Sequence, residues 1–205
     1  MDVSNRAFQM LREIKSVVFS TVKDGMPQSR IVDVMGADDQ GIYFMTCTIK
    51  PFHRQLKTSG HVAVTGMTKD YVQVRINGKV RALDGEALDR IFRDNPALGE
   101  LFPQGGIGES MAAYHVHEGV GEIFDLSGKV VKMKRERFAF GGSLVGPAGC
   151  TITPACVACG ACQKVCPFEA IVEGNPYSIV AEKCDECGNC VFACPVDAIE
   201  LPSGM

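Results

Sequence analysis

Two cysteine-rich stretches decide the fold of the last part of the chain: CVACGACQKVCP at residues 156–167 and CDECGNCVFACP at residues 184–195. Both read C-x2-C-x2-C-x3-C-P, and a shift of 28 residues, from 156 to 184, places all four cysteines and the proline of one on those of the other. The same shift maps Gly160 onto Gly188. Such an internal repeat predicts two similar halves related by a pseudo-twofold axis.

The spacing of these cysteines is that of thiolate ligands to four-iron clusters. Three cysteines separated by two residues each can wrap one face of an iron–sulfur cube in a tight turn, and the fourth cysteine of each run binds the other cluster. The small residues between the cysteines let backbone N–H groups approach the sulfides. The sequence therefore predicts two [4Fe–4S] clusters with crossed ligands. One set is Cys156, Cys159, Cys162 and Cys194, and the other is Cys184, Cys187, Cys190 and Cys166.

Zinc and disulfide bonds are the alternative uses of so many cysteines. A zinc site commonly takes two separated C-x2-C pairs, which fits two doubled quartets with trailing prolines poorly. Residues 148–203 resemble the two-cluster bacterial ferredoxins, which implies electron transfer. Cys150 is left over, and a buried thiol is a simpler interpretation of it than a ninth ligand.

The composition of the 205 residues is that of a globular protein, with 46% hydrophobic residues, 22% charged residues and a net charge of −3. This balance argues against a nucleic-acid partner. No apolar run approaches the roughly 18 residues of a membrane span. The opening stretch MDVSNRAFQM lacks the basic start and apolar core of a signal peptide. We therefore expect a cytoplasmic protein with no membrane span.

Short strands dominate the first 140 residues. Alternating or apolar runs predict strands in SVVFSTV, PQSRIVDVM, GIYFMT, HVAVTGM, YVQVRI and the region 111–126. Asp24-Gly25 predicts a turn, and Asn77-Gly78 predicts a two-residue hairpin before KVRAL. Six or more short strands with few helices predict a closed antiparallel barrel, in which Cys47 would fill the core.

Three helical segments are expected among these strands. Ser4 would cap the first, the stretch KPFHRQLKTSG would form a second that ends near Gly60, and residues 86–102 would form a third interrupted at Pro96. His115 and His117 share one face of a predicted strand. Without a third ligand nearby, two surface or cleft histidines are a simpler interpretation than a metal site.

The order of SRIVDV, then IYFMTCTIK with a helix after it, then VQVRINGKVRAL resembles the flavin-binding split barrels of the pyridoxamine 5′-phosphate oxidase-like superfamily over about residues 5–135. The resemblance implies FMN at the interface of a homodimer, with a deazaflavin as the alternative. It implies that an arginine, a lysine and a nearby hydroxyl hold the phosphate, while two backbone groups and an amide contact the ring. In this chain these residues are Arg30, Lys50, Thr46, Ile31, Val32 and Gln73.

The fold class expected is α+β, an antiparallel split β-barrel with a C-terminal two-cluster ferredoxin module. The expected domains are a flavin-binding barrel at residues 1–140, a linker at 141–149 and a 2[4Fe–4S] domain at 150–205. The ferredoxin module stands where the oxidase itself carries its substrate-recognition segment, so oxidation of pyridoxamine phosphate is not expected.

Flavin and clusters in one chain predict a flavin- and iron–sulfur-dependent oxidoreductase. It would pass electrons between two [4Fe–4S] clusters and FMN, and on to a small-molecule or protein acceptor, with ferredoxin or another electron carrier as redox partner. The alternative is a non-catalytic electron carrier or redox sensor. The sequence assigns no catalytic residue, no substrate and no direction of electron flow.

Overall fold

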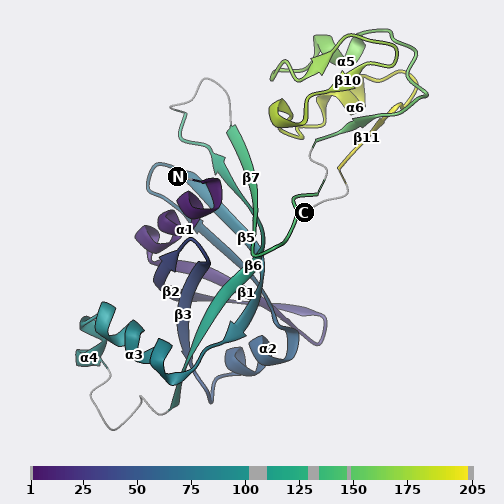
Figure 1. Ribbon diagram of the computed structural model, residues 1–205. Helices are drawn as coiled ribbons and strands as arrows, with labels where there is room; N and C mark the ends of the chain where they lie inside the picture. The colour runs from purple at the N-terminus through teal and green to yellow at the C-terminus, as the bar shows by residue number, and fades with distance from the viewer. Residues whose placement is uncertain (1, 102–109, 129–133, 147–148, 203–205) are drawn as a thin grey trace. The chain divides into compact units, whose positions relative to one another are not determined.

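The computed structural model describes residues 2–101, 110–128, 134–146 and 149–202 (Figure 1). The chain divides into two compact units, one of residues 1–127 and 136–144 and the other of residues 128–135 and 145–205. The fold is α+β, as the sequence predicts. No helix in the described ranges is long and apolar enough to cross a membrane.

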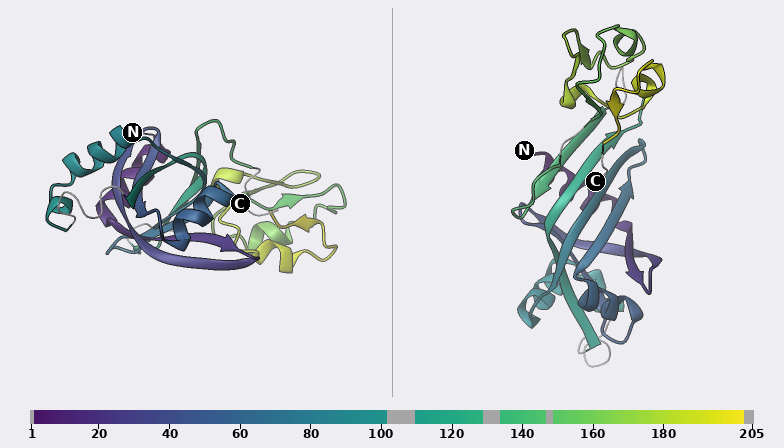
Figure 2. Two further views of the ribbon diagram at one scale, coloured as in Figure 1. Left: turned by 90° about the horizontal axis from the view of Figure 1, so that it is seen from below. Right: turned by 90° about the vertical axis from the view of Figure 1, so that its right-hand side faces the viewer.

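The first unit is a closed antiparallel barrel of six strands with one extra strand. The ring closes because β3 pairs with both β2 and β6, so that no edge remains between first and last strand. Figure 2 shows the strands curving around this ring. The strands are β1 (Ser16–Lys23), β2 (Met26–Asp38), β3 (Gly41–Cys47), β4 (His61–Met67), β5 (Val72–Ala82) and β6 (Met111–Asp125), with β7 (Lys134–Phe140) beside β6.

Four helices accompany the barrel: α1 (Val3–Ile14), α2 (Pro51–Ser59), α3 (Gly85–Asp94) and α4 (Ala97–Leu101). The prediction that Ser4 caps α1 is wrong. Asp2 is the cap, because its carboxylate accepts the Val3 N–H at 2.8 Å and the Ser4 hydroxyl at 2.5 Å. The second helix ends at Gly60 in the left-handed conformation, as predicted.

Aromatic side chains fill the barrel. Phe19 of β1, Phe44 of β3 and Phe8 of α1 are fully buried. Phe44 contacts Phe19 with ring centroids 4.6 Å apart and Tyr114 of β6 with centroids 5.5 Å apart. These rings come from three strands of the barrel, β1, β3 and β6, so their packing links these strands through the core.

The predicted hairpin at Asn77-Gly78 is wrong, because β5 runs straight through it. Asn77 pairs with Val120 and Gly78 with Gly119 of β6. A Cβ on Gly78 would lie 2.6 Å from the Val116 side chain, and a Cβ on Gly119 would lie 2.3 Å from the Asn77 carbonyl oxygen. The glycines therefore permit a close approach of two strands and do not mark a turn.

The second unit is built from short elements in two similar halves. One sheet pairs β8 (Thr151–Ile152) with β11 (Ile199–Glu200), and the other pairs β9 (Ile171–Val172) with β10 (Ser178–Ile179). Two short helices, α5 (Ala161–Lys164) and α6 (Asn189–Ala193), each follow a glycine cap, and the 3₁₀ turn η2 spans Ala181–Lys183.

The backbone of this unit follows the 28-residue repeat of the sequence. Gly160 and Gly188 have φ of 72° and 79°. The non-glycine residues with positive φ also come in pairs separated by the same shift. Ala158 and Glu186 have φ of 56° and 57°, and Glu169 and Asp197 have φ of 51° and 50°. A left-handed residue between the first two cysteines of each quartet folds the loop around a common centre.

Candidate functional site

Four cysteines of the first predicted ligand set line one cavity of the second unit. This cavity measures about 300 Å³, counting space open to solvent, and brings Cys194 from the second quartet together with three cysteines of the first. Apolar side chains of Ile152, Val157 and Ile199 complete its wall. The cysteines on it are Cys156, Cys159, Cys162 and Cys194.

The other ligand set lines a second cavity of about 310 Å³, again counting space open to solvent. Here Cys166 of the first quartet joins three cysteines of the second, so the fourth cysteine crosses over in both halves. A fifth cysteine, Cys150, lies on the same wall. The cysteines on it are Cys150, Cys166, Cys184, Cys187 and Cys190.

Backbone N–H groups point at several of these sulfurs. Ala158 donates to Cys156 Sγ at 3.4 Å, Ala170 to Cys166 Sγ at 3.4 Å, and Ala198 to Cys194 Sγ at 3.2 Å. The last two bonds are equivalent under the repeat, because each is made by the residue four positions after the fourth cysteine. Such bonds favour a thiolate over a thiol and tune an iron–sulfur centre when one is bound.

The chemistry of the two cavities fits a cluster. Burial is the main cause that raises the pKa of the Cys162 and Cys190 thiols. Four thiolates on one small apolar cavity would repel one another, and bound iron offsets that cost. Among the described residues, no group of three or more His, Cys, Asp or Glu side chains is arranged to hold a single metal ion. Ligands of a cube bind separate irons and need not converge on one point.

A groove on the barrel gathers most of the residues that the sequence predicts to contact flavin. It measures about 1330 Å³, counting space open to solvent, and lies where β2, β3 and the start of α2 meet. Its apolar wall is formed by methionines of β2, β3 and β6 with Leu98 and Leu101 of α4. Five of the six predicted contacts line it, namely Arg30, Ile31, Val32, Thr46 and Lys50.

Arg30 is held in place by neutral partners. Its Nη1 donates to Thr21 Oγ1 and its Nη2 to Gln55 Oε1, each at 2.8 Å, and its guanidinium lies 4.3 Å from the centroid of the Phe52 ring. Burial lowers the pKa of Arg30, yet an arginine remains charged at neutral pH. The groove therefore presents a cation that these uncharged side chains hold in a fixed position.

The start of α2 adds further groups that suit an anion. Lys50 is the N-cap residue and makes no capping bond with its side chain, and Pro51 follows at the first helical turn. The first N–H groups of a helix carry partial positive charge and lack intrahelical partners. The Thr46 hydroxyl is buried on the same groove. The arrangement suits a phosphate better than a neutral group.

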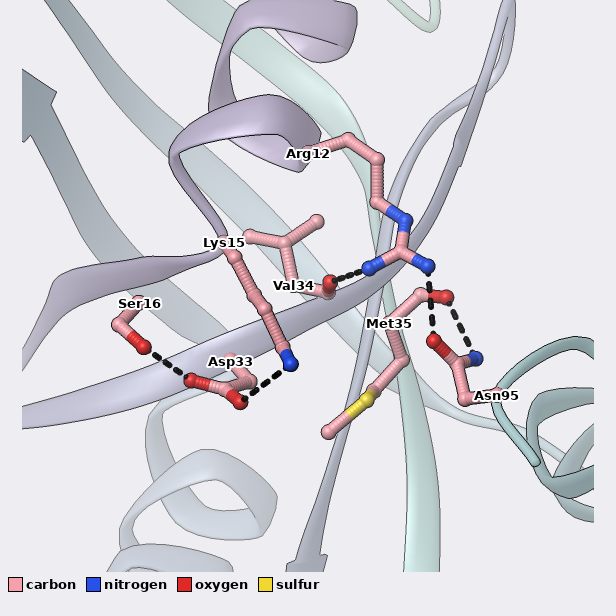
Figure 3. A network of polar contacts seen from close by, with 7 residues as sticks. All are labelled: Arg12, Lys15, Ser16, Asp33, Val34, Met35 and Asn95. Atoms are coloured by element: carbon pink, nitrogen blue, oxygen red, sulfur yellow. Dashed lines mark hydrogen bonds and ion pairs between the residues drawn. The ribbon is translucent and has the colours of Figure 1, made fainter. Parts of the chain in front are cut away.

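A polar network fixes the β2 side of this groove (Figure 3). Arg12 of α1 donates to the Val34 carbonyl and to Asn95 Oδ1, both at 2.7 Å. Asn95, which ends α3, donates in turn to the Met35 carbonyl at 3.0 Å. Ser16 holds the Asp33 carboxylate at 2.5 Å. The network ties α3 to β2 and thereby positions α4, which supplies part of the groove wall.

Gln73, the sixth predicted flavin contact, lies on β5, paired with Met67 and Phe124, and does not line this groove. Its role stays a prediction. Cys47 does not fill the barrel core, as the sequence suggested, but lies half-buried at the end of β3 on the groove. The reason is that the strand ends there and the next residues turn outward.

The prediction of surface or cleft histidines is wrong for His115, which is buried and stacked on Tyr43 with centroids 4.3 Å apart. Its Nε2 lies 3.1 Å from the Gln40 carbonyl oxygen and its Nδ1 lies 3.3 Å from Arg81 Nη2. Both ring nitrogens thus have protein partners. Burial, then the nearby Arg81, lowers the pKa of His115 to about 4.

Sequence reasoning missed Thr21 and Gln55, the partners of Arg30. A signal was present, because Thr21 follows Val17 and Phe19 at the inward-facing positions of one strand. A polar side chain at such a position needs a hydrogen-bond partner inside the barrel.

Comparison with known families assigns both units. Residues 4–104 match the family described as Pyridoxamine 5′-phosphate oxidase, and residues 155–199 match the 4Fe-4S dicluster domain. The chain joins a pyridoxamine 5′-phosphate oxidase-like domain to a 4Fe–4S dicluster domain. A flavin-binding fold and an iron–sulfur domain in one chain indicate a role in redox chemistry or electron transfer. No curated protein sequence matches the chain.

Solved structures similar to the pyridoxamine 5′-phosphate oxidase-like domain share its barrel. A NimC/NimA family protein from Clostridium acetobutylicum has 21% identity and a TM-score of 0.58, over 67% of this chain and 92% of its own. PhzG from Burkholderia lata, in complex with tetrahydrophenazine-1-carboxylic acid, has 18% identity and a TM-score of 0.51, over 66% and 81%. A C. acetobutylicum protein related to general stress protein 26 has 15% identity and a TM-score of 0.51, over 68% and 96%. At these identities the likeness shows the fold.

Proposed function

We propose that the protein is an oxidoreductase that passes electrons between two [4Fe–4S] clusters and FMN, and on to a small-molecule or protein acceptor. The observation that carries the proposal is the presence, in one chain, of two cavities that each hold one predicted set of four cysteine ligands and of a groove whose residues suit an anion. Thiolates at this spacing require the reducing conditions of a compartment such as the cytoplasm.

The groove supports FMN through its phosphate. Arg30 offers a planar fork of donors, Lys50 a mobile point charge, and the start of α2 the partial positive charge of a helix N-terminus. Thr46 adds a hydroxyl. Ile31 and Val32 line the same groove, and their backbone would meet the ring edge of a flavin whose phosphate sits at these donors.

Clusters exchange one electron at a time whereas a flavin accepts one or two, so the combination links single-electron carriers to two-electron chemistry. The chain between the last barrel strand and the dicluster domain supports an internal route. Its nine residues, GGSLVGPAG at 141–149, can span at most about 32 Å when fully extended. A long flexible tether would instead favour an independent carrier.

The groove is open, which favours an enzyme with its own substrate over an electron carrier whose flavin is covered by protein. Its wall continues from Thr46 and Lys50 to the apolar side chains of Met45, Leu98 and Met111. Ile31 and Leu101 lie at its edge with 63% and 69% of their surfaces exposed. A second copy of the chain would cover such apolar residues, and we propose a homodimer with FMN at the interface.

Anaerobic stopped-flow reduction tests the proposal. Reduced ferredoxin, or dithionite in its place, should bleach the cluster absorbance of the full chain. The flavin bands should then follow at a rate independent of protein concentration. A double variant, Cys159→Ser with Cys187→Ser, should retain FMN and lose this fast phase. Phe192→Ser, which changes an exposed residue of the dicluster domain that is not a predicted ligand, is the matched control.

Equal flavin reduction rates in the double variant and the parent would contradict electron delivery through the clusters. Absence of flavin from the anaerobic protein would contradict the assignment of the groove. Sedimentation of the flavin-loaded protein as a monomer would contradict the proposed homodimer. It would not affect electron delivery through the clusters or the assignment of the groove to flavin.

A further inference from the structure

A fifth cysteine lies on one of the two cluster cavities and has no counterpart on the other. Cys150 is 4% exposed and lines the cavity formed by Cys166, Cys184, Cys187 and Cys190. It shares this wall with Cys184 and Cys190, and a Cβ placed on the preceding residue, Gly149, would lie 3.3 Å from Cys184 Sγ. A cube needs four protein ligands, and the two quartets already supply them, so this thiol is extra.

The backbone around Cys150 is fixed, so the position of its thiol is set by the fold. The preceding Gly149 donates its N–H to Glu186 Oε1 at 3.0 Å, and a Cβ on Gly149 would lie 3.0 Å from Cys184 Cβ. The following Thr151 pairs with Glu200 in the two-stranded sheet. Both sides of Cys150 are therefore anchored to the loops that carry the cysteines.

The internal repeat shows that the two halves differ at this place. Cys150 immediately precedes β8, and Tyr177 immediately precedes β10, the equivalent strand of the other half. Tyr177 is buried and lines the first cavity, with its hydroxyl oxygen 3.0 Å from a Cβ placed on Gly160. One half thus fills the position with a phenol ring, and the other half fills it with a thiol beside two ligand sulfurs.

We propose that the Cys150 thiol donates a hydrogen bond to a ligand thiolate, Cys184 or Cys190, and so gives that cluster a higher reduction potential than it would otherwise have. The inference rests on the clusters of the proposed function. A reduced cluster carries one more negative charge than an oxidised one, and a donor to its ligand sulfur stabilises that form. A thiol that binds no iron is protonated at neutral pH, because the usual pKa of a cysteine is about 8.5, and it can act as a donor.

Redox titration of the anaerobic protein, followed by electron paramagnetic resonance, tests this role. Cys150→Ala should shift one midpoint to lower potential and leave the other unchanged, with eight irons and eight sulfides per chain as in the parent. Cys150→Ser keeps a donor and should restore much of the shift. Tyr177→Phe, the matched change in the other half, should leave this midpoint unchanged. The signal lost in Cys187→Ser identifies the cluster concerned.

Three results would overturn the inference. Two unchanged midpoints in Cys150→Ala would show that the thiol does not tune a cluster. Loss of about four irons in this variant would make Cys150 a ligand. A shift confined to the cluster that Cys187→Ser retains would place the effect in the wrong cavity. A parent protein without iron would remove the proposed function itself, whereas the first three results leave it standing.

Discussion

The Nη2 of Arg30 donates a hydrogen bond to the Oε1 of Gln55 at 2.8 Å. Arg30 belongs to β2 and Gln55 to α2, so the bond links the strand and the helix that flank the groove. The Thr21 hydroxyl donates to the same amide oxygen at 2.6 Å and accepts from Arg30 Nη1. Both acceptors are neutral. They therefore fix the orientation of the guanidinium without neutralising its positive charge, which can then attract an anion.

Changing Gln55 to glutamate should weaken FMN binding without loss of the fold. The new carboxylate would keep the shape of the amide and its bond to Arg30, but it would neutralise the cation that faces the phosphate. Affinity for FMN should fall several-fold, whereas affinity for riboflavin, which lacks the phosphate, should not. Titration of flavin-free protein with both ligands measures the difference, and a parallel loss for both would contradict a phosphate-specific role.

Gln55→Leu should lower stability as well. It leaves the Thr21 hydroxyl and a donor of Arg30 without their partner inside the barrel, at a cost of about 1–3 kcal/mol in the free energy of unfolding. Urea unfolding of the two Gln55 variants gives this cost. An equally unstable Gln55→Glu variant would mean that the two effects cannot be separated at this residue.

Arg30→Ala and Lys50→Ala should each weaken FMN binding. A charge-assisted hydrogen bond contributes roughly 1.5–3 kcal/mol, which corresponds to about a ten- to hundredfold loss of affinity. Lys57→Ala, near the other end of α2, is the matched control and should bind FMN as the parent does. If Arg30→Ala also bound FMN as tightly as the parent, Arg30 would not belong to the phosphate site.

The parts of this structure that follow from short sequence patterns were predictable. The alternating runs gave the barrel strands, and the cysteine spacing predicted the two sets of four that now line separate cavities. The failures arose where a local pattern has two physical causes. Asn77-Gly78 suits a turn, but glycine also suits a close approach of two strands, and only the pairing with β6 decides between them.

The roles of residues that act through tertiary contacts could not be predicted from the sequence. Gln55 meets Arg30 across 25 positions of sequence, and nothing in the helix around Gln55 indicates that partner. Cys150 likewise joins a cavity whose other cysteines begin 16 residues later, at Cys166. The role proposed for it depends on its place beside these ligand cysteines, which the cysteine repeat alone does not reveal.

The barrel should lose stability as the pH falls from about 6.5 to about 4. His115 is neutral when folded, because burial and Arg81 lower its pKa to about 4, whereas the unfolded chain takes up a proton near pH 6.5. The contribution of His115 is thus complete above pH 6.5 and declines through this window. The linkage slope of about 1.4 kcal/mol per pH unit makes the total roughly 3 kcal/mol.

Unfolding free energies measured across this range test the assignment. His115→Gln should flatten the acid slope, although it also removes the stacking on Tyr43 and so lowers stability at pH 7. His61→Gln, a change at an exposed histidine of β4, controls for the loss of one histidine. A slope that persists unchanged in His115→Gln would assign the acid sensitivity to other groups, such as the nearby His117, whose pKa is also lowered by burial.

The fourth cysteine of each quartet lies with the first three cysteines of the other quartet. This crossed assignment leads to a prediction that single substitutions alone cannot test. Cys194 lies on the cavity of the first quartet and Cys166 on that of the second. Cys194→Ala should therefore damage the cluster that Cys156, Cys159 and Cys162 hold, and iron should fall toward four per chain. Cys47→Ala, a substitution outside the dicluster domain, should keep all eight irons.

Pairs of substitutions separate crossed from uncrossed ligands. Under the crossed assignment, Cys194→Ala with Cys156→Ala removes two ligands of one cluster, so the pair should lose no more iron than the worse single variant. Cys194→Ala with Cys184→Ala removes one ligand from each cluster and should lose both. Iron and sulfide counts on anaerobic protein distinguish these outcomes, because uncrossed ligands would give the reverse, with both clusters lost in the first pair and one retained in the second. Circular dichroism of each pair shows whether the barrel remains folded, so that the iron counts report ligand loss alone.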